Sequence, residues 1–365
     1  MSTLMQASRQ WASRPDDERF TSLLALHAHT TEQRNQSAGR VVSSRALEVR
    51  PSESDFNEGL EVFGPNGHGY TPTNYSFGQL ATLAQAPAGY LRSLPAPIAA
   101  DALNYGLQFN RDAEEVGVLL RRNGNNILAA ATGPRYGRIW NNDVTGQLVN
   151  RFGDGVHGDW RVPGEFGKAV AISKANTTLY ASDRDMFVFL ADETNRVELP
   201  NRRDGKSGSL ARGFFVWNSE VGATTLGIAM FLFDYVCCNR IVWGAEGYKE
   251  IKLRHTVTAP DRFAEEVAPL IADYSSSSPK PIEDVLQAAQ RHKLDNVADF
   301  LANRRFTRPT VRKIAAAFEE DEGRPMETLW DVTTGITAYA RAIPFQDERI
   351  SLEREAGRVL ELVEV

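Results

Sequence analysis

The stretch that decides the fold is GFFVWNSEVGATTLGIAMFLF, residues 213–233. Two apolar runs, 213–217 and 226–233, are rich in Phe, Val and Ile, which favour β-strands. The polar segment 218–222 lies between them and predicts a turn. Asn218 and Ser219 can bond backbone groups there, and Gly222 tolerates unusual dihedral angles. The two runs therefore predict successive strands of a β-sheet.

The same β signal continues on both sides of this stretch. Asn123-Gly124 separates two apolar runs, which is a strong hairpin signal. Further upstream, residues 40–50 alternate between apolar and polar side chains, and residues 60–63 form a short apolar run, so both are expected to be strands. The predicted strands are 40–50, 60–63, 115–122, 126–132, 186–190, 213–217, 226–233, 240–243 and 251–257.

Helical patterns surround these strands. Apolar spacing predicts helices near 20–36, through most of 75–108 and at 143–151, and everything beyond the Ser/Pro-rich linker 275–281 reads as helix. The predicted class is α+β, with a mixed, mainly antiparallel sheet body, flanking helices and an all-α C-terminal segment. The predicted domains are an N-terminal helical arm (1–38), an α+β core domain (39–275) and a C-terminal helical domain (279–365).

Composition excludes several classes of protein. The chain has 365 residues, with 42% hydrophobic and 24% charged residues, so it is neither disordered, collagen-like nor a coiled-coil rod. Its 41 Lys+Arg and 47 Asp+Glu give a net charge of -6. This balance argues against coating duplex DNA by bulk charge, but it leaves room for a local basic groove.

The cysteine and histidine patterns predict neither a metal nor a cofactor. The two cysteines, Cys237 and Cys238, are adjacent, which excludes a disulfide scaffold and a CxxC zinc knuckle. The six histidines show no metal-ligand spacing. No secretory signal is visible and the longest apolar run is too short for a membrane span, so we expect a cytoplasmic protein with no membrane partner.

Basic residues cluster locally, and aromatic residues lie among them. Residues 304–313 (RRFTRPTVRK) form the densest basic patch, the segment 202–212 is polar and basic, and Lys252 and Arg254 share one face of a predicted strand. Such clusters favour contacts with phosphates and bases. The candidate nucleic-acid-binding residues are Arg135, Tyr136, Arg202, Arg203, Lys206, Lys252, Arg254, Arg304, Arg305 and Phe306. Arg212, at the end of the basic segment, could join them as part of a mobile arm.

An enzymatic alternative stays open. A turn does not need a carboxylate at position 220, and a thiol near a histidine and an arginine has the residue types for acid–base or thiol chemistry. The candidate catalytic residues for an unknown reaction are Glu220, Cys238, Asn239, Arg254 and His255.

Several short strings resemble the phage/plasmid-like protein family (domain of unknown function 932). They occur in the family's order and include Asn218-Ser219-Glu220-Val221-Gly222, Val236-Cys237-Cys238-Asn239, Arg254-His255-Thr256, Arg135-Tyr136 and Leu329-Trp330-Asp331. At residues 237–240 the family pattern has Cys-Thr-Asn-Gly, whereas this chain has Cys-Cys-Asn-Arg. The resemblance implies a protein of phages, prophages or plasmids, and it carries no catalytic residues.

The sequence thus predicts a cytoplasmic, homo-oligomeric protein of a mobile genetic element. It would bind single-stranded DNA and assist annealing or recombination by a non-covalent mechanism, with phosphates held by Lys/Arg and bases stacked on aromatics. The loose similarity of element order to single-strand annealing proteins is an analogy. The alternatives are the enzyme above and an interaction protein that antagonises host defence.

Overall fold

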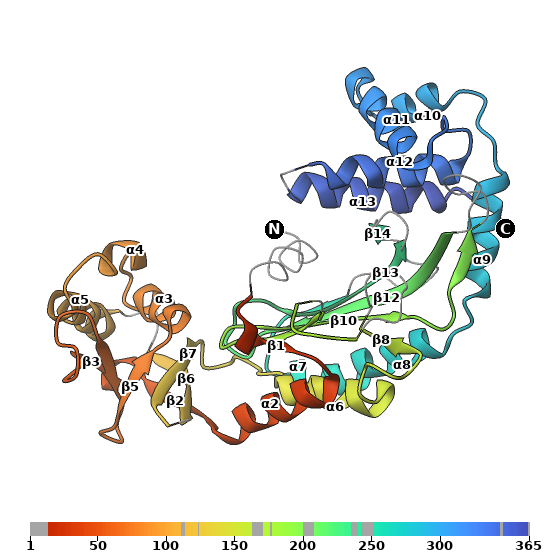
Figure 1. The fold of residues 1–365 in the computed structure, drawn as a ribbon. Coiled ribbons are helices and arrows are strands. Elements are labelled where there is room, and N and C mark those ends of the chain that lie inside the picture. Colours follow the sequence, from red (N-terminus) through yellow and green to blue (C-terminus); the bar gives the residue numbers. More distant parts are fainter. Residues whose placement is uncertain are drawn as a thin grey trace.

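The computed structural model describes residues 14–110, 114–122, 124–162, 171–175, 177–199, 208–234, 240–241, 251–343 and 346–363. Within these ranges the fold is α+β, with two sheets, flanking helices and helices at the C-terminus, which confirms the predicted class. Figure 1 shows the small sheet at one end of the molecule, the large sheet in the middle and the C-terminal helices beyond it.

The large sheet is antiparallel throughout its described pairs. Its main path runs β1-β9-β10-β12-β13-β14, while β8 pairs with β10, β11 with β12 and β15 with β13. The strands are β1 (Arg19–Phe20), β8 (Trp160–Arg161), β9 (Leu179–Ala181), β10 (Met186–Asp192), β11 (Val197–Leu199), β12 (Gly208–Asn218), β13 (Leu226–Asp234), β14 (Arg240–Ile241) and β15 (Ile251–Leu253).

Strands β12 and β13, both predicted as strands, pair in a register that sets Phe214 opposite Met230. Successive side chains of a strand point to opposite faces. Phe214 and Val216 belong to a first core, while Phe215 packs against Phe187 and Phe189. Both faces of this pair are covered, which explains its nearly unbroken apolar sequence.

Helices cover one face of the large sheet (Figure 1). They are α2 (Leu23–Asn35), α6 (Asn141–Phe152), α7 (Ala259–Arg262) and α8 (Ala268–Ser276), with a π-helical turn, Phe263–Val267, between the last two. Leu23 and Leu26 lie in the same core as the sheet. Helix α2, which falls in the segment assigned to an N-terminal arm, therefore packs as an integral part of this body.

The small sheet has the order β2-β6-β7-β5-β4-β3, and its β5–β7 pair is parallel. The predicted hairpin is present as β6 and β7, and three helices build a separate core on this sheet. The elements are β2 (Ser37–Ser43), β3 (Glu48–Pro51), β4 (Leu60–Phe63), β5 (Gly69–Pro72), β6 (Glu115–Arg122), β7 (Asn126–Thr132), α3 (Asn74–Leu83), α4 (Ala88–Leu91) and α5 (Ala96–Phe109).

The C-terminal helices form their own core, which Leu210 and Leu232 of the large sheet join. They are α9 (Lys280–Arg291), α10 (Val297–Asn303), α11 (Arg308–Glu322), α12 (Leu329–Arg341) and α13 (Gln346–Leu360). The predicted linker is shorter than expected, because only 277–279 separate α8 from α9.

Arg212 anchors this linker, and its assignment to a mobile basic arm is wrong. The side chain is 1% exposed, pairs with Asp192 at 2.6 Å and donates to the carbonyl of Ser277 at 2.8 Å. Its guanidinium also lies over the rings of Trp160 and Tyr274. A buried arginine needs these partners because desolvation of an unpaired charge is costly.

We expect Asp192→Asn to destabilise the protein by about 3–5 kcal/mol, because it leaves the buried Arg212 charge without its partner. Urea denaturation followed by circular dichroism measures the change. The matched control is Glu48→Gln, which breaks the exposed Glu48–Arg50 pair and should leave the midpoint unchanged. Equal midpoints for Asp192→Asn and the control would contradict the role of Arg212.

Candidate functional site

The predicted turn at residues 218–222, called here the NSEVG turn, connects β12 to β13 where the two sheets meet. Asn218 is buried and donates from Nδ2 to the carbonyl of Ile139 at 2.8 Å and to Oδ1 of Asn141 at 2.9 Å. Ser219 Oγ donates to the carbonyl of Arg184 at 2.7 Å. The predicted local role holds only for Ser219, whose Oγ accepts from the N–H of Ala223 at 2.9 Å, because the bonds of Asn218 reach remote residues.

The NSEVG turn also contacts helix α3 of the small-sheet body. Gly222 has a φ of +89°, in the left-handed region that favours glycine. Its carbonyl accepts from the Tyr75 hydroxyl at 2.9 Å, and the carbonyl of Val221 accepts from Gln79 Nε2 at 2.7 Å. The turn is thus fixed from both sides.

Glu220 is 1% exposed and joins three parts of the chain. One carboxylate oxygen accepts from Arg121 Nη2 on β6 at 2.5 Å, and the other accepts from the backbone N–H of Asn141 at 2.7 Å. Asn141 is the first residue of α6, where a negative charge is favourable. The carbonyl of Glu220 also accepts a bond from Arg138.

His255 and Tyr136 stack at the same place. Their ring centroids are 4.8 Å apart and their planes differ by 24°, and the Tyr136 hydroxyl donates to the carbonyl of Ser219 at 2.8 Å. Burial raises the pKa of Tyr136. Burial lowers the pKa of His255 to about 4, Arg138 acts in the same direction, and the contact of Nδ1 with the carbonyl of Gly137 opposes both. Both rings are neutral near pH 7.

We call this region the junction: the NSEVG turn, residues 135–141, Arg34, Arg121 and residues 254–256. It contains Glu220, His255 and Arg254 of the catalytic alternative, while Cys238 and Asn239 lie outside the described residues. Both Glu220 oxygens are bound in the interior, and Arg254 is exposed. Within the described chain, the carboxylate and the imidazole thus make contacts that hold the junction together.

Some of the predicted nucleic-acid-binding residues lie at or near the junction, and others lie outside the described residues. Arg135 and Arg254 are exposed at the junction, and Lys252 is exposed on β15. Arg202, Arg203 and Lys206 lie outside the described residues, as does the family-motif residue Cys237.

The C-terminal patch differs from what its sequence suggests. Arg304 pairs with Glu355 at 2.6 Å, and Phe306 packs against the core of the C-terminal helices, so its ring is not free to stack on a base. Arg305 is exposed, with a φ of +68°. Tyr136 is likewise occupied by His255.

Four arginine and aromatic residues of the junction were not among the sequence candidates: Arg34, Arg121, Arg138 and Trp140. The Arg34 guanidinium carbon lies 3.7 Å from the centroid of the Trp140 ring, and that of Arg138 lies 5.6 Å from the same centroid and 5.2 Å from the centroid of Tyr136. A signal was present, because basic and aromatic residues alternate along 135–140 (RYGRIW). Arg34, on α2, carries no such signal.

Comparisons with known proteins do not identify the chain: no family model, curated protein or solved structure matches it. In the described ranges, His, Cys, Asp and Glu side chains do not gather in threes at a place that could hold a metal ion. Of the helices in the described chain, none combines the length and apolar character of a membrane span.

We expect Gly137→Ala to destabilise the junction by about 3 kcal/mol, because a Cβ there would lie 1.7 Å from the carbonyl oxygen of Thr256. The control is Gly133→Ala, whose Cβ would meet nothing within 4 Å. Thermal unfolding of the two variants measures the difference. Identical melting temperatures would show that the 137–256 contact does not form.

We expect the free energy of unfolding to decrease as the pH is lowered from about 6.5 to about 4. In this range His255 stays neutral in the folded state, while the same residue of the unfolded chain takes up a proton. Across this pH range the titration of His255 lowers the free energy of unfolding by roughly 3 kcal/mol. Urea titrations of wild type and His255→Gln at pH 7 and pH 4.5 measure it. The exposed control variant, His68→Gln, should keep the wild-type dependence, whereas a wild-type slope in His255→Gln would refute the assignment.

Proposed function

We propose that the protein binds single-stranded nucleic acid at the junction, through its phosphates and without covalent chemistry. The observation that carries this proposal is a group of arginines that form no salt bridge among the described residues: Arg34, Arg135, Arg138 and Arg254. Asp143 and Glu220 act on Arg34 and Arg138 only electrostatically, beyond ion-pair distance. Guanidinium groups outside ion pairs offer the donors that phosphate oxygens accept.

Aromatic rings order two of these arginines. Trp140 has the guanidinium of Arg34 at 3.7 Å and that of Arg138 at 5.6 Å. Cation–π contacts restrain a guanidinium and leave its N–H edge available for hydrogen bonds. In this proposal the rings of Tyr136 and Trp140 thus position arginines, whereas the sequence suggested that aromatic rings stack on bases.

Arginines elsewhere behave differently. On the C-terminal helices they form ion pairs with acidic residues, namely Arg304–Glu355, Arg324–Asp331, Arg341–Asp321 and Arg358–Glu355. Within the basic patch 304–313, however, only Arg304 has such a partner among the described residues, while Arg305, Arg308 and Arg312 are exposed. The contacts of Arg34 and Arg138 with aromatic rings, rather than a lack of charge in the C-terminal patch, therefore favour the junction.

A single strand suits this arrangement better than a duplex. Duplex DNA carries twice the charge per unit length, and a chain with a net charge of -6 repels a long polyanion outside its basic region. A few ordered arginines match the few phosphates that a short length of one strand presents.

The cellular setting extends the proposal. The resemblance to the phage/plasmid-like family supports a cytoplasmic role in a mobile genetic element, in annealing or recombination of DNA, with self-association into a homo-oligomer that would join neighbouring binding sites. These parts rest on the resemblance, and the arginine geometry supports strand binding itself.

Strand binding predicts a strong dependence on salt. With four phosphate contacts, the logarithm of the association constant should fall with the logarithm of salt concentration with a slope of about -3. Replacing Arg135 and Arg254 together by alanine should weaken binding and reduce that slope by about 1.4. Fluorescence anisotropy of a labelled oligo(dT) in a salt series measures both quantities.

The control removes the same charge from the C-terminal patch. Arg308 and Arg312 are exposed on α11, so their double alanine variant should bind with the wild-type slope. No binding at low salt would refute the proposal. A loss in the α11 variant alone would transfer the binding site to the C-terminal helices, and tighter binding of duplex would refute the preference for a single strand.

A further inference from the structure

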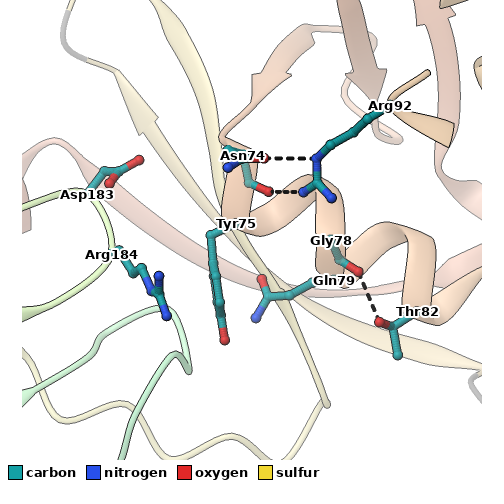
Figure 2. Close-up of a pocket in the computed structure, with 8 residues that line it drawn as sticks. All are labelled: Asn74, Tyr75, Gly78, Gln79, Thr82, Arg92, Asp183 and Arg184. Carbon is teal, nitrogen blue, oxygen red and sulfur yellow. Dashed lines mark hydrogen bonds between the residues drawn. The ribbon is translucent and has the colours of Figure 1, made fainter. Parts of the chain in front are cut away.

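A cavity of about 400 Å³ lies beside the junction, between helix α3 and the turn that joins β9 to β10. Figure 2 shows Asp183 and Arg184 of that turn on one side and Asn74, Tyr75 and Gln79 of α3 on the other, with Arg92 next to Asn74. Its volume lies at the low end of the roughly 300–1,000 Å³ typical of small-molecule sites. The cavity is therefore large enough for one small ligand.

Two arginines line this cavity. Arg92 donates from Nε to Oδ1 of Asn74 at 2.9 Å and from Nη2 to its carbonyl at 2.8 Å, which fixes the guanidinium and leaves Nη1 for a ligand. Arg184 is exposed, and its guanidinium has no ion-pair or hydrogen-bond partner among the described residues. Two cationic groups at one cavity favour an anion with several acceptor oxygens, such as a phosphate.

The aromatic ring of Tyr75 stands in the same cavity and is held in place. Its hydroxyl donates to the carbonyl of Gly222 at 2.9 Å, and the neighbouring Gln79 is bound at both ends, to Val221 and Ala131. The guanidinium carbon of Arg184 lies 5.4 Å from the centroid of the Tyr75 ring. A fixed ring beside a cation can take a planar base without a further ordering cost.

Asp183 adds an acceptor beside these donors. It is exposed at the cavity, where a carboxylate can accept from a sugar hydroxyl or a base N–H. Phosphate donors, an aromatic face and a carboxylate together match the three chemical parts of a nucleotide better than they match an inorganic ion or an apolar molecule.

We propose that this cavity binds one nucleoside 5′-monophosphate unit, with its phosphate at Arg92 and Arg184 and its base at Tyr75. The unit can be a free nucleotide or the 5′-phosphorylated end of a strand. The inference does not rest on the proposed function, since Arg92 and Arg184 are not among the four arginines that carry it.

Calorimetric titration of the full chain tests the inference. We expect 5′-dAMP to bind with a Kd between about 1 μM and 1 mM, and inorganic phosphate or deoxyadenosine to bind at least about tenfold more weakly, because each makes only part of the contacts. A 5′-phosphorylated tetranucleotide that competes with 5′-dAMP would identify a strand end as a ligand, and one that does not would identify the free nucleotide.

Variants locate the binding. Arg184→Gln should weaken 5′-dAMP binding about tenfold or more, because a charge-assisted contact to the phosphate is lost. Tyr75→Phe keeps the ring and should retain most of the affinity, whereas Tyr75→Leu should lose it while circular dichroism reports an intact fold. Arg312→Gln, on α11, serves as the control and should bind like wild type.

Three results would overturn the inference: no saturable binding of 5′-dAMP at millimolar concentration, wild-type affinity in Arg184→Gln, or equal affinity for phosphate and 5′-dAMP. Each can be told apart from failure of the proposed function, which is tested by oligonucleotide binding in the Arg135/Arg254 double variant.

Discussion

The structure depends on a buried carboxylate, Glu220, that binds Arg121 of the small sheet and the first backbone N–H of α6. Taking a carboxylate and a guanidinium out of water is costly, so such a pair persists only when its remaining polar atoms are bonded. Here the two carboxylate oxygens, the carbonyl of the same residue, the Nδ2 of Asn218 and the Oγ of Ser219 have partners, whereas Asn218 Oδ1 has none among the described residues. One five-residue turn thereby fixes the relative placement of two sheets and a helix.

This placement determines where positive charge is available. The segment between β7 and α6 must pass the NSEVG turn, and it carries alternating arginines and aromatics that pack on one another and on α2. Both oxygens of the Glu220 carboxylate are already bound, to Arg121 and to the N–H of Asn141, so Arg138 forms no salt bridge with it within the described chain. A residue that has a structural role therefore also creates the conditions for binding an anion.

Local patterns in the sequence predicted much of the fold. The hairpin 115–122 and 126–132, the turn at 218–222 and the C-terminal helices follow from short-range signals. Helices at 259–276 were not predicted, because a π-helical turn at Phe263–Val267 alters the usual apolar spacing.

The candidate site was less predictable because its contacts are remote in sequence. Arg121 lies 99 residues from Glu220, so nothing local shows why a carboxylate is needed in the turn. In the densest basic patch, likewise, the partner of Arg304 is Glu355, 51 residues away, which no local pattern shows. A cluster of basic residues in the sequence does not show how many of them are free to bind an anion, because their acidic partners in the fold are not known from the sequence.

The most direct test is hydrogen exchange of the full chain with and without saturating oligo(dT). Strand binding at the junction predicts slower exchange at residues 134–141, at the C-terminal turn of α2 and at 254–258, with unchanged exchange in α10 and α11. Slower exchange confined to α10 and α11, or none anywhere, would contradict it.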